Sequence, residues 1–394
     1  MAVHIPERCS WRGSECRCSL VLPAQSHPVG LGIRLDTQYS GTEMGKRHHY
    51  VPRFYLKAFA SAPKRIHLLN LRREQSLANV SLRDQCYSHR LYGQDDELED
   101  AFATLESAAS PLLTNISEHA CLPRVGSDEH QLLLTFLSLQ LSRTLAAQQQ
   151  GMRMSATLGN AVFNGSPPSD WELSPADAML MMLSTAGGMR DTLADLEMLL
   201  VQAPDSSQFA TSDNPVFRYN MYCEGVKHFG VTGTTQLGFQ IFFPLSPSLT
   251  LHLFDAGVYK AGSRKRSNGV IRATADDVLC LNRLQLVSAG ENVYFNDWSV
   301  RGTLMNMLSN IRRLRAQSRP HINVAVSDAD KQHELIHQYW PMPQIGLRLS
   351  FLTFRRNARR TPLFERSRLI RPPYQKAPIE HSGPSQRYTV RRRI

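Results

Sequence analysis

The sequence predicts an α+β fold, in which a helical N-terminal half packs with an antiparallel or mixed sheet from the C-terminal half. Apolar residues recur at steps of three and four over residues 95–200, as in helices with one buried face. After Pro204, short strand-like runs are separated by Pro, Gly and Ser. With 394 residues, 42% of them hydrophobic, the chain can bury a sizeable core.

The expected elements follow in order along the chain. Helix signals include acidic residues at 95–97, a cap at Ser127 or Asp128, and Ser174-Pro175 at the third start. Alternation of apolar and polar residues, as over 249–254, marks strands with one buried face. We therefore expect helices over 95–119, 128–150, 176–200 and 275–288, and strands over 65–71, 209–216, 236–243, 249–254 and 293–295.

The net charge of +11 lies at the C-terminal end. Residues 346–394 contain thirteen Arg or Lys and two acidic residues, and the other 345 residues contain 32 of each sign. We expect a single domain over 44–345 and a basic, largely disordered tail over 346–394. Such a tail predicts non-specific binding of nucleic acid, or no function beyond solvation. No apolar run is long enough to span a membrane.

Residues 1–43 are rich in Cys, Gly, Pro and Ser and show no periodicity. They lack the apolar core of a signal peptide. Either they form a disordered leader, or translation starts at Met44. The seven cysteines lie singly, without a C-x-x-C pair, which favours a reducing cytoplasm over a structural zinc site. The sequence does not predict an oligomeric state.

The second expected helix carries two polar residues on an otherwise apolar face. Gln140 and Arg143 share a stripe with Leu133 and Phe136, so they point inward or into a cleft. A buried guanidinium needs an anionic partner. Three interpretations remain: Arg143 extends to the surface, forms a structural ion pair, or faces a ligand.

The run Thr211-Ser212-Asp213-Asn214-Pro215 follows a strand-like segment. Asp and Asn before Pro are typical of a turn. A sharper hypothesis is that the turn directs Asp213 towards Arg143, as an ion-pair partner, a general base or a metal ligand. Asn214 would then line the same cleft.

His48 and His49 are adjacent, so an extended backbone points them to opposite faces. One can act as a ligand or base while the other packs. Asn282, inside the helix over 275–288, either satisfies a buried backbone group or binds a ligand.

The motif His48-His49-Tyr50-Val51-Pro52, followed by Tyr55-Leu56 and Phe59, resembles the start of the bacterial family known as domain of unknown function 4238. The run Thr211–Val216 is a second match, and Phe243-Pro244-Leu245-Ser246-Pro247 and Leu281-Asn282 are weaker ones. The resemblance covers roughly residues 45–300 and departs from the family at Arg53, where Gln is frequent. It implies a fold unit and a set of polar positions, but no established activity.

The candidate site therefore comprises His48, His49, Gln140, Arg143, Asp213, Asn214 and Asn282. The chain lacks the P-loop, G-x-S-x-G, H-E-x-x-H and Rossmann signatures. The mix of His, Asp and Arg suits hydrolysis of a phosphate ester or nucleic acid assisted by a divalent metal. The alternative is a non-catalytic binding or regulatory protein in which these residues form a structural polar network.

Overall fold

The computed structural model describes residues 47–93, 97–226, 230–262, 269–316, 321–327, 334–375 and 388–392, with only the backbone for 316, 321–327, 334–338 and 388–392. The expected leader, residues 1–43, lies outside the described residues. The fold is α+β, as predicted. Its first strands and helix are β1 (Arg47–His49), α1 (Arg53–Lys57), β2 (Arg65–Asn70), β3 (Gln75–Ser81) and β4 (Tyr87–His89).

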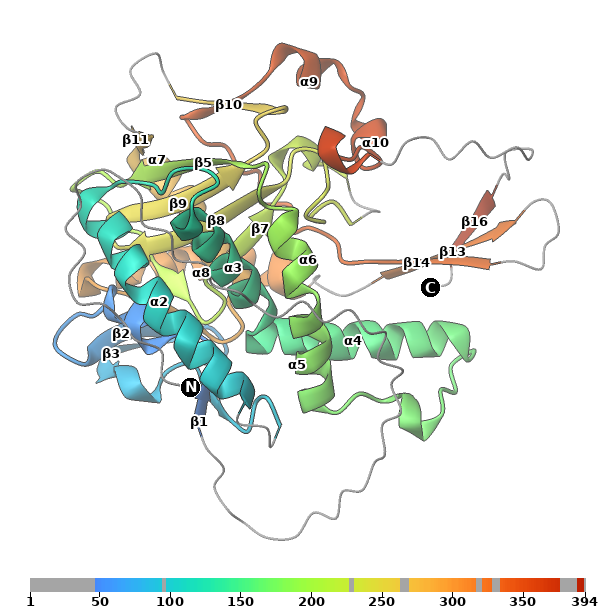
Figure 1. The fold of residues 1–394 in the computed structure, drawn as a ribbon, viewed down its shortest axis with the longest axis horizontal. Coiled ribbons are helices and arrows are strands. Elements are labelled where there is room, and N and C mark those ends of the chain that lie inside the picture. Colours follow the sequence, from blue (N-terminus) through green and yellow to red (C-terminus); the bar gives the residue numbers. More distant parts are fainter. Residues whose placement is uncertain are drawn as a thin grey trace, which may run out of the picture. The chain divides into compact units, whose positions relative to one another are not determined.

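Helices and strands alternate along the chain more than the expected division into a helical N-terminal half and a C-terminal sheet suggests. A helical region follows β4, and two long helices, α7 and α8, lie among the later strands (Figure 1). The helical region consists of α2 (Glu97–His119), α3 (Asp128–Ser142), α4 (Leu145–Val162), α5 (Pro175–Ser184) and α6 (Ala186–Asp191). The remaining elements are β5 (Glu197–Gln202), β6 (Thr211–Ser212), β7 (Phe217–Tyr219), β8 (Gln240–Ser246), β9 (Leu249–Phe254), β10 (Tyr259–Ala261), β11 (Val270–Arg272), α7 (Ala275–Ser288), β12 (Asn292–Phe295), α8 (Arg301–Ala316), β13 (His321–Ser327), β14 (Glu334–Tyr339), β15 (Leu352–Phe354), α9 (Arg356–Arg360), α10 (Leu363–Arg366) and β16 (Tyr388–Arg392).

A five-stranded mixed sheet, ordered β11-β5-β9-β8-β7, forms the centre. Only β11 and β5 are parallel. Alternate residues of the strands enter two cores, because successive side chains point to opposite faces. Leu251 and Ile241 join the core that includes α2 and α3, whereas Phe242 and Phe254 join the core that includes α7. The sheet therefore lies between two helical layers (Figure 1).

A second sheet, ordered β3-β2-β12-β6, joins the N-terminal segment to the C-terminal half. Its strands are antiparallel. It packs against α8 through Leu69, Phe295 and Leu308. Three further groups of paired strands are β1-β4, β10-β15 and β14-β13-β16.

Two of the expected helices are interrupted. The helix expected over 128–150 breaks at Arg143, and the Thr144 hydroxyl caps α4 by accepting from the backbone N–H of Ala147 at 3.2 Å. The helix expected over 176–200 ends at Asp191, and Glu197–Gln202 pairs with β9 instead. The strands expected over 209–216 and 236–243 are also displaced, to 211–212 and 240–246. Tertiary pairing outweighs local helix propensity here.

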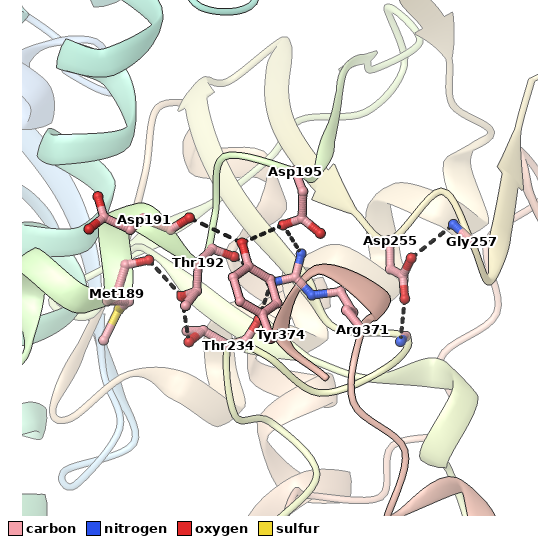
Figure 2. A network of polar contacts seen from close by, with 10 residues as sticks. Met189, Asp191, Thr192, Asp195, Thr234, Asp255, Gly257, Arg371 and Tyr374 are labelled. Atoms are coloured by element: carbon pink, nitrogen blue, oxygen red, sulfur yellow. Dashed lines mark hydrogen bonds and ion pairs between the residues drawn. The ribbon is translucent and has the colours of Figure 1, made fainter. Parts of the chain in front are cut away.

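Residues 346–375, part of the expected disordered tail, are docked on the domain. Leu347, Leu349 and Phe351 enter the core beside α7. Arg371 is only 1% exposed, pairs with Asp195 at 2.5 Å and donates to the carbonyls of Thr192 and Thr234 (Figure 2). Alternating apolar residues and one buried arginine thus fix a segment whose charge composition resembles that of a disordered tail. The rest of the expected tail, apart from the backbone of 388–392, lies outside the described residues.

Candidate functional site

The two adjacent histidines lie on β1 and have different environments. His48 is 2% exposed, and its ring stacks on Tyr92 with the centroids 5.2 Å apart. His49 is half-buried, and its Nε2 lies 3.2 Å from the carbonyl oxygen of Arg83. This difference agrees with the alternation expected of an extended segment. His49 lines a pocket.

Gln140 and Arg143 lie at the end of α3 and are buried, as the stripe predicts. The Gln140 amide donates to the Tyr50 carbonyl at 2.9 Å, and its oxygen accepts from Arg143 Nε at 3.0 Å. Arg143 Nη1 lies 2.8 Å from Glu106 Oε1 on α2, and the guanidinium lies 5.0 Å from the Phe102 ring centroid. These contacts tie the first sequence motif to α2 and α3.

The anion that pairs with Arg143 is Glu106, and the expected pairing with Asp213 is wrong. Asp213 is buried, and its carboxylate accepts from three successive backbone N–H groups, those of Gly290, Glu291 and Asn292, at 2.7–2.9 Å. Burial raises the pKa of Asp213 despite these donors. Asp213 therefore holds the turn between α7 and β12, which leaves no pairing role with Arg143.

Asn214 and Asn282 form hydrogen bonds with other parts of the fold. Asn214 accepts from the Thr144 hydroxyl at 3.1 Å and donates to the Ser288 carbonyl at 3.0 Å. Asn282 accepts from the N–H of Ala210 at 2.8 Å and donates to the carbonyl of Gln208 at 2.9 Å. Of the two interpretations of Asn282, the structure thus supports the satisfaction of buried backbone groups.

An open pocket of about 600 Å³ brings His49, Arg53 and Glu106 together between α1 and α2. Burial lowers the pKa of His49, so its imidazole is neutral near pH 7. Burial raises the pKa of Glu106 against the opposing effect of Arg143. An imidazole and a carboxyl with displaced pKa values in one pocket form a combination suited to proton transfer.

A second, larger pocket of about 910 Å³ adjoins the first and shares Arg53 and Phe54 with it. We call it the basic pocket. No carboxylate is among its described lining residues, and none of its bases forms an ion pair with a described carboxylate. Its lining residues are Arg53, Phe54, Lys57, Pro63, Lys64, Arg65, Ser81, Leu82 and Arg83. All five bases are exposed, so their charges face solvent.

The expected metal role has no support in the part of the chain that the structure describes. There, no group of three or more His, Cys, Asp or Glu side chains is arranged to hold an ion. Asp213, the expected carboxylate ligand, is committed to backbone N–H groups. Within those same described ranges, no helix has the length and apolar character needed to cross a membrane.

Glu106 and the bases of the basic pocket were not predicted from the sequence. Glu106 is on the half-buried side of α2, and only the tertiary fold sets it against Arg143. A local signal for the bases did exist, since Arg53, Lys57, Lys64 and Arg65 lie within thirteen residues without an acidic residue. The neutral charge sum of residues 1–345 concealed this local excess.

Comparison with curated proteins and with solved structures gives no match. A family model described as "Protein of unknown function (DUF4238)" matches residues 47–299. The match begins at β1 and ends beyond β12, and it includes both pockets and the turn held by Asp213. The chain therefore belongs to the DUF4238 family.

Proposed function

We propose that this protein is a binding protein for nucleic acid, and that it holds the phosphate backbone on the basic pocket. The observation that carries the proposal is five exposed bases around one depression without a described carboxylate among them. Lys and Arg that neutralise phosphates release condensed counterions, which supplies most of non-specific affinity for nucleic acid.

The geometry of the bases suits an extended anion better than a small one. Arg53 and Lys57 project from α1, Lys64 and Arg65 from the start of β2, and Arg83 from the turn after β3. Five bases distributed over three elements can contact successive phosphates of an extended strand. Phe54 is half-buried at the same surface and offers a ring on which a base can stack.

The basic tail remains a second candidate for the same ligand. Part of it has other roles, since Arg371 is buried in an ion pair and Arg366 donates to the Tyr222 carbonyl at 2.9 Å. Deleting residues 361–394 would therefore remove structural contacts as well as charge. Substitutions that remove equal charge from the pocket and from the tail give a cleaner comparison.

The test measures binding of a fluorescein-labelled 20-nucleotide single-stranded DNA by anisotropy at low salt. Three variants each replace three bases by Gln: Arg53, Lys57 and Lys64 in the pocket; Arg391, Arg392 and Arg393 in the tail; and Arg124, Arg153 and Lys260 at exposed positions outside both. We expect the pocket variant to lose at least tenfold in affinity, because each lost phosphate contact removes a share of the counterion release.

The variant at Arg124, Arg153 and Lys260 is the matched control, since it makes the same change in net charge. An equal loss in the control would mean that net charge alone governs binding. A loss confined to the tail variant would assign binding to the tail and refute the pocket.

The pocket of His49 and Glu106 supports a second candidate function, acid–base cleavage of a phosphate ester in the bound strand. Neutral His49 would accept a proton from an attacking water and return it to the leaving oxygen, beside the Glu106 carboxylate that Arg143 holds. Arg53 lines both pockets and would hold the reacting phosphate. The lowered pKa of His49 and its place in one pocket with Arg53 motivate this candidate.

Cleavage is tested by incubating the labelled strand with the protein and EDTA and resolving the products by electrophoresis. Under the acid–base hypothesis the intact protein cleaves, and His49→Gln lowers the rate at least 100-fold while binding is unchanged. If the His49→Gln variant cleaves as fast as the intact protein, or if neither cleaves, the hypothesis fails and the binding proposal is unaffected.

A further inference from the structure

We propose that the chain has a separate binding site for a small organic carboxylate, in which Arg218 holds the carboxylate group. This site lies against the edge of the central sheet. It shares no lining residue with the basic pocket or with the pocket of His49 and Glu106. It therefore stands independently of the proposed nucleic-acid binding.

Arg218 is the middle residue of the edge strand β7. Its neighbours Phe217 and Tyr219 are buried in the core beside α7. Because strand side chains alternate, Arg218 points away from this core, and both Phe217 and Arg218 line a pocket at the edge of the sheet. The pocket is formed by α4, the end of α7 and the segment Trp340–Pro343.

Arg218 is half-buried but has no hydrogen bond or ion pair with any described residue. The buried arginines Arg143 and Arg371 differ, since each has a carboxylate partner at 2.8 Å or less. Desolvation lowers the pKa of Arg218, so its charge is held in an unfavourable environment. An anion supplied from solution would remove this cost and accept two parallel hydrogen bonds from the guanidinium.

The remaining lining residues define the ligand. Trp340, Pro341 and Val287 supply apolar surface, and Thr232 and Gln150 add polar groups. Thr232 forms no hydrogen bond with a described residue, so its hydroxyl can bind the ligand. The cavity volume is about 170 Å³. Since one water needs about 10–15 Å³ of such volume, the cavity accepts a ligand with on the order of ten heavy atoms.

One positive charge in a small cavity with a mixed polar and apolar lining favours a monoanion over a polyphosphate. A planar carboxylate matches the fork of a guanidinium in two-point contact, and an aromatic body would pack on Trp340. The ligand class is therefore a small monocarboxylate with an apolar or aromatic body, which benzoate represents.

The test titrates the full chain with benzoate, and with benzamide as the uncharged control of the same shape. Binding is followed by calorimetry and by the change in tryptophan fluorescence. We expect benzoate to bind at least tenfold more tightly than benzamide, and Arg218→Met to abolish this difference. Trp340→Phe should remove most of the fluorescence change and leave calorimetric binding detectable. Arg272→Met, which changes an exposed arginine on the opposite edge strand, should bind as the natural chain does.

The unliganded variant provides a second readout. Because Arg218→Met removes a desolvated charge without a described partner, it should melt at the same temperature as the natural chain or higher. A clear fall in melting temperature without ligand would reveal a structural partner and overturn the proposal. Equal binding of benzoate and benzamide would also overturn the proposal. So would an equal loss of benzoate affinity in Arg272→Met, or no binding of benzoate up to about 50 mM.

Discussion

Replacing Glu106 by Gln should destabilise the fold by about 2–3 kcal/mol, because it leaves the Arg143 charge buried without an anion. Breaking a buried ion pair typically costs about 3–5 kcal/mol. The side chain of Arg143 is 1% exposed and that of Glu106 is 25% exposed, so solvent reduces the loss only on the Glu106 side. Arg143 also keeps its bond to Gln140 at 3.0 Å, which places the expected loss below the usual range.

The reverse substitution, Arg143→Met, should cost less, about 1–2 kcal/mol, because Glu106 can reach solvent and Met retains apolar volume beside Phe102. The double variant should then be less destabilised than the sum of the two singles by about 1–2 kcal/mol. This coupling energy reports the ion pair itself.

The assay is urea unfolding of the full chain at pH 7, followed by circular dichroism, for both single variants and the double variant. A second cycle combines Arg143→Met with Asp213→Asn. Since Asp213 bonds to the N–H groups of residues 290–292, this cycle should be additive within about 0.5 kcal/mol. Additive effects in the Glu106 cycle, or coupling in the Asp213 cycle, would refute the assignment of partners.

Three further predictions concern other parts of the chain. A chain that begins at Met44 should melt within about 2 °C of the full chain, and a larger loss would show that residues 1–43 stabilise the fold. Arg371→Met should lower the free energy of unfolding by about 3 kcal/mol in urea, because it leaves two carbonyls without their donor and Asp195 with only the Tyr374 hydroxyl, whereas the exposed neighbour Arg368→Met should change it by less than about 0.5 kcal/mol. Burial lowers the pKa of His252 from 6.5 to about 3, so the unfolded chain binds a proton that the folded chain does not, and stability should fall as the pH drops below 6.5. Between pH 7 and pH 5 this group should account for about 2 kcal/mol of lost stability, and His252→Gln should flatten that part of the pH profile; an unchanged slope would contradict the assignment.

The fold class could be predicted from the sequence because periodicity is local information. The helix at α2, the Ser127 cap and the strands β2 and β9 lie at or near the predicted positions. The strand at 197–202 could not be predicted, because it depends on pairing with β9, far away in the chain. The break at Arg143 was missed although the Thr144 cap that begins α4 is a local signal.

The candidate site could be predicted only in part, because its contacts also join residues far apart in the chain. The stripe on α3 predicted that Arg143 is buried, and the need for an anion followed from that burial. Identifying Glu106 required knowledge of how α2 packs against α3. The sequence favours Asp213 as the partner of Arg143 because its turn motif is visible locally. The backbone N–H groups that Asp213 binds belong to a turn about 80 residues further along the chain.

The salt dependence of nucleic-acid binding tests the central proposal most directly. The slope of the logarithm of the binding constant against the logarithm of the salt concentration reports the number of phosphates neutralised, at about −0.7 for each phosphate on a single strand. If Arg53, Lys57 and Lys64 each contact one phosphate, their replacement by Gln should make the slope less negative by about 2. The variants of Arg124, Arg153 and Lys260 and of Arg391, Arg392 and Arg393 should keep the natural slope. An unchanged slope in the pocket variant would contradict the account.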